Sequence, residues 1–253
     1  MIEQNIYERL LRFRQTGRKG FAVLIDPDKE DGRGLGKIMS VAEKAGIDFF
    51  LVGGSHLQND HLEACVELLK TSSIPVVLFP GDARQISAQA DAILLLSLIS
   101  GRNSELLIGQ HVAAAPLLKT SGLEILPTGY MLVDGGAPTS VSYISGTQPI
   151  PATSNEIAAN TALAGQMLGM KLIYLEAGSG ARNAVPAEMI KAVRAELTIP
   201  LIVGGGISNA EMATAACEAG ADLIVVGNAI EKDVTLIEEL AMAVHLTNVK
   251  ARA

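Results

Sequence analysis

The chain has 253 residues, a formal net charge of −7 and hydrophobic side chains at 49% of its positions. The length is typical of one (β/α)₈ barrel, and the apolar content is sufficient for a large core. The acidic balance argues against a nucleic-acid partner. No apolar run reaches the roughly 18 residues of a membrane span, so we expect no transmembrane segment and at most transient contact with a membrane surface.

Cys65 and Cys217 both lie in helical patterns and are expected to be buried, free thiols. Two cysteines in a chain of this length indicate a reducing compartment. The charged amino-terminal segment shows no apolar signal-peptide core. We therefore expect a cytoplasmic protein.

Apolar strand-like runs alternate with helical patterns along the chain, and most of the runs are continuous, as in parallel strands buried on both faces. The strand-like runs lie at 21–26, 48–52, 75–79, 91–96, 123–126, 130–133, 172–176, 200–203 and 222–226. The helical patterns lie at 3–15, 35–45, 60–70, 104–114, 154–169, 186–197, 208–219 and 233–246. The segment 123–134 is interpreted as one fifth strand, bent or broken at Pro127-Thr128-Gly129. The alternation predicts a TIM barrel forming a single domain over residues 1–253.

The connection after the third strand is too short for a normal crossover helix. The echoed dipeptides Ile74-Pro75 and Ile199-Pro200 lead to Asp91 and Asp222, which follow 17 and 23 positions after the isoleucines. We expect the barrel's third helix to be missing or replaced by an extended segment that opens the wall near Phe79 and Ile86; a merely short helix is the alternative. A second repeated motif, Ala-Gly-x-Asp, occurs at the start of the strands at 48–52 and 222–226. It reflects either descent from a duplicated unit or a sequence pattern common to βα units in general.

Glycine turns follow the last two strands. Gly204-Gly205-Gly206 ends one strand, and Gly227-Asn228 ends the next. The loops after strands 7 and 8 form the common phosphate site of (β/α)₈ barrels, where backbone N–H groups face the anion. The pair of turns therefore predicts a phosphate-binding site.

Polar residues also end the first, second and sixth strands. Asp26 can hold Mg²⁺ through one oxygen while the metal binds a substrate phosphate, although Asp-Pro-Asp is also turn chemistry, and Asp28 is a second candidate. Ser55 either completes the metal shell or caps the next segment. Tyr174 and Glu176 point to one side of their strand, where Glu176 can accept or remove the proton of a substrate hydroxyl, unless it is a structural buried carboxylate.

Taken together, these stretches resemble the geranylgeranylglyceryl phosphate synthase family, including its bacterial heptaprenyl relatives. The matching stretches are Ala22 to Lys29, Leu51 to Ser55, Pro127 to Tyr130, Tyr174 to Gly180, Val203 to Ile207 and Val226 to Ala229. The resemblance implies a modified TIM barrel whose third helix is replaced by an extended segment. It also implies the joining of sn-glycerol 1-phosphate to a polyprenyl diphosphate, such as geranylgeranyl diphosphate, with release of diphosphate.

The resemblance also assigns roles to residues. Asp26 and Ser55 match the Mg²⁺ positions, and Glu176 orients or deprotonates the attacking hydroxyl. The substrate-binding positions are Tyr174, Leu175, Glu176, Ala177, Gly178, Ser179, Gly180, Gly204, Gly205, Gly227 and Asn228. The segment 135–151 resembles the oligomer-forming branch of the family, so we expect a homo-oligomer. The alternative functions are another phosphate-binding barrel enzyme (an isomerase, lyase or flavin enzyme) and a non-catalytic phosphometabolite sensor.

Overall fold

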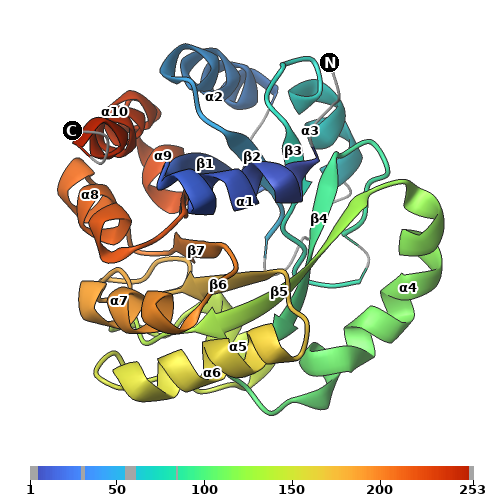
Figure 1. Cartoon of the computed structure of the whole chain (residues 1–253). Helices are drawn as coiled ribbons and strands as arrows, with labels where there is room; N and C mark the ends of the chain where they lie inside the picture. The colour runs from blue at the N-terminus through green and yellow to red at the C-terminus, as the bar shows by residue number, and fades with distance from the viewer. Residues whose placement is uncertain (1–4, 30–31, 55–60, 84, 251–253) are drawn as a thin grey trace.

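The computed structural model describes residues 5–29, 32–54, 61–83 and 85–250. Eight parallel strands close into a barrel in the order β1 to β8, with helices packed outside (Figure 1). The strands are β1 (Gly20–Ile25), β2 (Phe49–Val52), β3 (Val76–Leu78), β4 (Ala92–Leu98), β5 (Glu124–Leu132), β6 (Leu172–Glu176), β7 (Leu201–Gly204) and β8 (Leu223–Val226). The predicted TIM barrel is confirmed.

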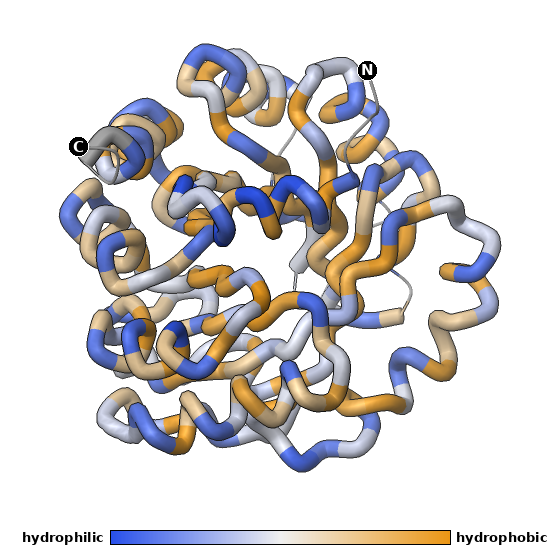
Figure 2. Tube along the Cα trace, in the orientation of Figure 1, coloured by the Kyte–Doolittle hydropathy of each residue, from blue (hydrophilic) through white to orange (hydrophobic). Residues whose placement is uncertain are grey.

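The helices alternate with the strands and include one π-helical turn, η1. They are α1 (Ile6–Thr16), α2 (Gly32–Ala45), α3 (Leu62–Leu69), η1 (Glu105–Gly109), α4 (Gln110–Ser121), α5 (Ser140–Ser145), α6 (Asn155–Met167), α7 (Ala187–Glu196), α8 (Ala210–Ala219), α9 (Asn228–Lys232) and α10 (Leu236–Lys250). The outer helices mix hydrophilic and hydrophobic residues along their turns, as amphipathic helices over a core do (Figure 2). Among the described residues, no helix is long and apolar enough to cross a membrane.

No helix follows β3 in the described residues between Leu78 and Ala92; the chain runs there as an extended and turn-like segment. The missing third barrel helix is therefore confirmed. The single fifth strand predicted over 123–134 is confirmed as β5, but the interruption predicted at Pro127-Thr128-Gly129 is wrong, because β5 continues through these residues. Pro127 is tolerated because β6 begins opposite Thr128, so the missing N–H lies outside the β5–β6 ladder.

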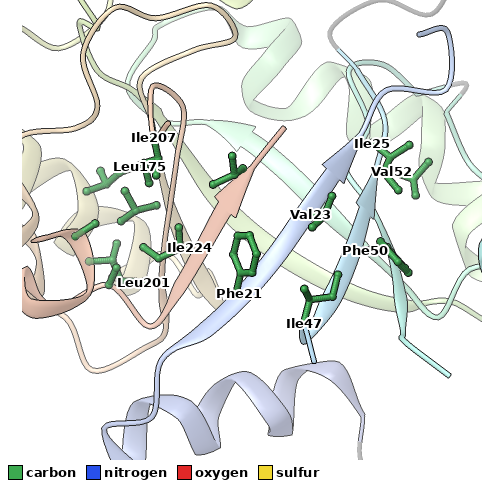
Figure 3. Close-up of a cluster of buried hydrophobic side chains, with 14 of the residues drawn as sticks. Phe21, Val23, Ile25, Ile47, Phe50, Val52, Leu175, Leu201, Ile207 and Ile224 are labelled. Atoms are coloured by element: carbon green, nitrogen blue, oxygen red, sulfur yellow. The ribbon is translucent and has the colours of Figure 1, made fainter. Parts of the chain in front are cut away.

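The apolar side chains of the strands form two clusters, one outside the barrel and one inside it, because successive side chains point to opposite faces. Phe21, Val23 and Ile25 of β1 face outward to the helices, in the cluster that Figure 3 shows. Alternate positions face into the barrel, where they meet the buried face of α1. The amino-terminal helix thus closes the end of the barrel at which the strands begin (Figure 1).

Buried aspartates fasten this same end of the barrel. Asp48 accepts a hydrogen bond from the backbone N–H of Phe21 at 3.0 Å and pairs with Arg9 and Arg18 at 2.9 and 2.7 Å. Asp222 accepts the N–H of Leu201 at 2.9 Å and pairs with Arg194. Each aspartate joins the start of its own strand to the start of the preceding one, which leaves the opposite end free for function.

Candidate functional site

A cavity of about 620 Å³ opens at the carboxyl ends of the strands. Residues that follow β1, β2, β7 and β8 line it, together with the end of β6. This end of a (β/α)₈ barrel is where the active sites of such enzymes lie. The predicted residues that line the cavity are Asp26, Tyr174, Glu176, Gly178, Ser179, Gly180, Gly205, Gly227 and Asn228.

The other predicted residues that the structure describes do not line this cavity. Leu175 and Ala177 are buried in the outer cluster, so their side chains face the helices rather than the cavity. Gly204 ends β7 just before the cavity wall. Ser55 lies outside the described residues. The alternation of side chains along β6 explains why Leu175 and Ala177 face away from the cavity, because only every second residue can face the interior.

Glu176 is the buried acid of the cavity, with 6% of its surface exposed. Its Oε1 accepts a hydrogen bond from the Gly178 N–H at 2.6 Å. Burial raises the pKa of Glu176 to about 7, although the Gly178 N–H and the nearby Tyr174 hydroxyl lower it in part. A carboxyl group with a pKa near 7 is suited to proton transfer at neutral pH.

Tyr174 faces Glu176 from the same strand and is fully buried. Burial raises the pKa of Tyr174 well above its usual value, so the phenol stays protonated. Among the described residues, its hydroxyl oxygen completes no hydrogen bond of normal geometry. A buried hydroxyl without a partner is costly unless a ligand satisfies it.

The glycine turns bring backbone close to Glu176. Gly205 has φ +79°, and a Cβ there would overlap Glu176 Oε1 and the backbone nitrogens of Gly178 and Ala177. Across the cavity, the Ser179 hydroxyl donates to Asn228 Oδ1 at 3.0 Å and so joins the loops after β6 and β8. Gly205 therefore cannot carry a side chain, and its replacement would disturb Glu176 as well as any phosphate site.

Asp26 lies at the opposite wall of the cavity, half-buried after β1. Its Oδ1 accepts the Asp28 N–H at 3.1 Å, and its Oδ2 lies 3.3 Å from Lys29 Nζ. Lys29 also pairs with Glu231 at 3.1 Å. The described residues contain no group of three or more acidic, His or Cys side chains suited to a metal. Asp26 therefore offers one carboxylate, paired with Lys29, at this wall of the cavity. A Mg²⁺ ion held there would take its other ligands from waters and from a substrate phosphate.

A second, apolar cavity of about 130 Å³ opens where the third barrel helix is missing. Phe79, Ala83 and Ile86 line it from the extended segment, and Leu106 lines it from the π-helical turn. The two cavities share Gly54, Phe79, Tyr130, Val141 and Ile144 among their linings. The polar site therefore continues into an apolar pocket through the opened wall.

Three aromatic rings mark the junction of the two cavities. The Tyr174 ring centroid lies 5.3 Å from that of Phe79 and 5.5 Å from that of Tyr130. Tyr130 was not predicted as a site residue. With a break expected in the fifth strand, the face of the sheet to which its side chain points could not be assigned. In the observed register Tyr130 lies opposite Tyr174, and an unbroken strand would have indicated this.

His111 also lines the apolar cavity. Its Nε2 lies 3.1 Å from the Ser97 hydroxyl. Burial lowers the pKa of His111, so the ring is neutral at pH 7. The two cysteines are buried and free, as expected.

The fold and site define a (β/α)₈-barrel protein with a polar cavity at the strand ends and an apolar pocket behind one opened wall. The chain belongs to the PcrB family, whose family model matches residues 13–245. The geranylgeranylglyceryl phosphate synthase of Chitinophaga pinensis is 53% identical over 245 residues, covering 96% of this chain and 97% of that protein. The enzyme of the same name from Thermococcus gammatolerans is 44% identical, covering 92% of each chain.

A solved structure agrees with these relatives. The (S)-3-O-geranylgeranylglyceryl phosphate synthase of Thermoplasma acidophilum, in complex with its substrate sn-glycerol-1-phosphate, superposes with a TM-score of 0.90 at 35% identity. The superposition covers 97% of this chain and 99% of that chain. The family resemblance seen in the sequence is confirmed.

Proposed function

We propose that this protein is a prenyltransferase that joins sn-glycerol 1-phosphate to a polyprenyl diphosphate, with geranylgeranyl diphosphate as the expected donor. An ether bond forms between the glycerol hydroxyl oxygen and the first prenyl carbon. The bond from that carbon to the diphosphate oxygen breaks, and its electron pair leaves with the diphosphate. The hydroxyl proton passes to Glu176 or to solvent. The observation that carries the proposal is the polar cavity around Glu176 that continues into an apolar pocket.

Glycerol 1-phosphate is assigned to the side of the cavity formed by β6, β7 and β8. Backbone N–H groups at Gly205 and Gly227 can face the phosphate, and Ser179 and Asn228 join the two loops above it. Glu176 then accepts the hydrogen bond of the attacking hydroxyl, or removes its proton. The Tyr174 hydroxyl, which lies beside the Glu176 carboxyl, is also available to a second oxygen of the glycerol backbone.

The prenyl diphosphate is assigned to the side of β1 to β4. Its tail is assigned to the pocket behind the opened wall, because that pocket is apolar, and its diphosphate would lie near Asp26. Asp26 would hold Mg²⁺, which neutralises charge on a leaving diphosphate. Because the allylic carbon develops carbocation character as the diphosphate leaves, the chain's main task is to position the hydroxyl and to keep water out.

The direct test is a product assay. The purified protein is incubated with Mg²⁺, sn-glycerol 1-phosphate and a mixture of prenyl diphosphates of graded length, and products are identified by mass spectrometry. We expect one prenyl ether and equimolar diphosphate, with little product from the mirror-image sn-glycerol 3-phosphate. Absence of any prenyl ether would overturn the proposal, and a yellow purified protein would instead favour a flavin enzyme on the same barrel.

Placing a bulky side chain in the apolar pocket should shorten the preferred prenyl tail. Ala83 lines this pocket, so Ala83→Trp would fill part of it, while glycerol 1-phosphate binding should stay unchanged. Burial is worth about 0.8 kcal/mol per CH₂, so each excluded isoprene unit should weaken binding strongly. Product profiles across tail lengths measure the effect. Ala88→Trp is the matched control, because Ala88 is exposed on the same segment; an identical length preference in both variants would place the tail elsewhere.

We propose that the protein assembles as a homo-oligomer through the region of α5. Tyr143 on this helix is 89% exposed, and an exposed aromatic ring is typical of interface anchors. Tyr143→Ser should therefore reduce the molar mass measured by light scattering. Met242→Ser on α10, which also removes an exposed apolar side chain, should leave the mass unchanged. A wild-type protein that is monomeric at micromolar concentration would contradict the assignment.

A further inference from the structure

Gln85 is a buried polar side chain in the segment that replaces the third barrel helix. Only 4% of its surface is exposed. Its Nε2 donates a hydrogen bond to the Gly54 carbonyl at 3.0 Å, and its Oε1 accepts the Gly81 N–H at 3.0 Å. The Gly54 N–H lies 3.5 Å from the same Oε1. The one side chain thus ties the turn after β2 to the turn after β3.

The backbone at this junction is packed tightly. Gly53 has φ +150°, and a Cβ there would overlap the Phe79 carbonyl group. The Gly53–Gly54 turn therefore lies directly against the start of the extended segment, and Gln85 bonds both sides of that contact. An amide supplies the donor and the acceptor that this arrangement needs, which neither a carboxylate nor an apolar side chain does.

The clamped turn lies between the two parts of the candidate site. Gly54 and Phe79 line both the polar and the apolar cavity. A Cβ built on Gly54 would lie 3.4 Å from the Asp26 carboxylate, so this glycine packs against the candidate metal ligand. A prenyl diphosphate that spans the two cavities must pass the lining that they share, and within that lining Gly54 packs against the Asp26 carboxylate.

We propose that Gln85 is a positioning residue for the prenyl diphosphate. It holds Gly54 at the boundary between the two cavities and so sets where the diphosphate lies relative to the tail. This inference rests on the prenyl-transfer function proposed above. Because Gln85 contacts neither Glu176 nor the glycine turns after β7 and β8 in any hydrogen bond of the described residues, the glycerol phosphate side should not depend on it.

The test compares a variant with a matched control. Gln85→Met keeps the length of the side chain and removes its hydrogen bonds. Gln89→Met makes the same change on the same segment, at an exposed glutamine that bonds Glu63 and not Gly54. We expect Gln85→Met to raise the KM for prenyl diphosphate roughly tenfold, as the loss of the buried hydrogen bonds that hold the Gly54 turn suggests. The calorimetric Kd for glycerol 1-phosphate should change less than twofold, and Gln89→Met should match the wild type.

Binding without turnover gives an independent readout. In calorimetry with geranylgeranyl diphosphate and Mg²⁺ but no glycerol 1-phosphate, Gln85→Met should bind more weakly than Gln89→Met. If the Gln85→Met variant does not fold, Gln85→Glu is used as the second test of the positioning role. The carboxyl group that this substitution introduces opposes the Gly54 carbonyl when it is ionised, whereas it can donate a hydrogen bond to that carbonyl when it is protonated. The KM defect of the Gln85→Glu variant relative to the wild type should therefore shrink as the pH falls from 8 to 6.

The outcomes separate the two proposals. Equal losses of affinity for both substrates, or a lower melting temperature with unchanged constants, would overturn the positioning role and leave Gln85 as a structural residue. Prenyl transfer by the wild type and by Gln89→Met supports the proposed function whatever Gln85 does. If neither of these forms a prenyl ether, the function fails first, and the role of Gln85 fails with it.

Discussion

Glu176→Gln should lower turnover on the order of 10²–10⁴-fold if Glu176 is a general base. Glutamine keeps the shape of the side chain and can still accept the Gly178 N–H through its amide oxygen. It cannot take a proton at neutral pH. The KM for glycerol 1-phosphate should change little, because the phosphate is assigned to the glycine turns. Steady-state kinetics with both substrates measures the split between turnover and binding.

The pH profile distinguishes a base from a hydrogen-bond acceptor. Since burial raises the pKa of Glu176 to about 7, the wild-type kcat/KM should rise as the pH increases through 7, and the variant should lose this limb. A raised carboxyl pKa also means that the charged form disfavours the folded state above pH 7. The glutamine variant should therefore be at least as stable as the wild type at pH 8, which controls for misfolding.

A smaller loss of turnover in Glu176→Gln would indicate a different role for Glu176. A loss well below 10²-fold would indicate that Glu176 orients the hydroxyl while the carbocation character of the prenyl carbon drives the reaction. Wild-type turnover and binding in the glutamine variant would contradict both roles. The buried carboxylate would then be structural, held by its hydrogen bond from the Gly178 N–H.

The barrel was predictable because its strands are nearly continuous apolar runs of the right number and spacing. The short connection between Ile74 and Asp91 also sufficed to predict the missing helix. The echoed Ala-Gly-x-Asp motif has a physical explanation in Asp48 and Asp222. Each carboxylate accepts a backbone N–H at the start of the preceding strand, so the motif is set by barrel closure at the amino end.

The finer parts of the site depend on contacts between residues far apart in the chain. Lys29 meets Glu231 from the loop after β8, and Gln85 meets Gly54 from the neighbouring turn. No local sequence pattern indicates these pairings, so Lys29 and Gln85 were not predicted as site residues. Tyr130 differs from them, because correct treatment of Pro127 as a strand residue would have placed it beside Tyr174.

Asp26→Asn should impair turnover and Mg²⁺ dependence together. The substitution keeps the size of the side chain and its hydrogen bond from the Asp28 N–H, but removes the charge that a divalent cation needs. Charge stabilisation by a bound metal is worth several kcal/mol, so we expect a loss of about 10²–10³-fold in kcat/KM for the prenyl diphosphate. Titration of activity with Mg²⁺ should show a higher half-saturating concentration.

Two controls make this result specific to the diphosphate. Calorimetric affinity for glycerol 1-phosphate, measured with a chelator present, should equal that of the wild type, because the phosphate is assigned to the opposite side of the cavity. Glu231→Gln removes the other carboxylate that pairs with Lys29, so it tests whether a released lysine alone explains the loss. If Asp26→Asn keeps full Mg²⁺-dependent activity, the metal is held elsewhere, and Asp28 becomes the next carboxylate to replace.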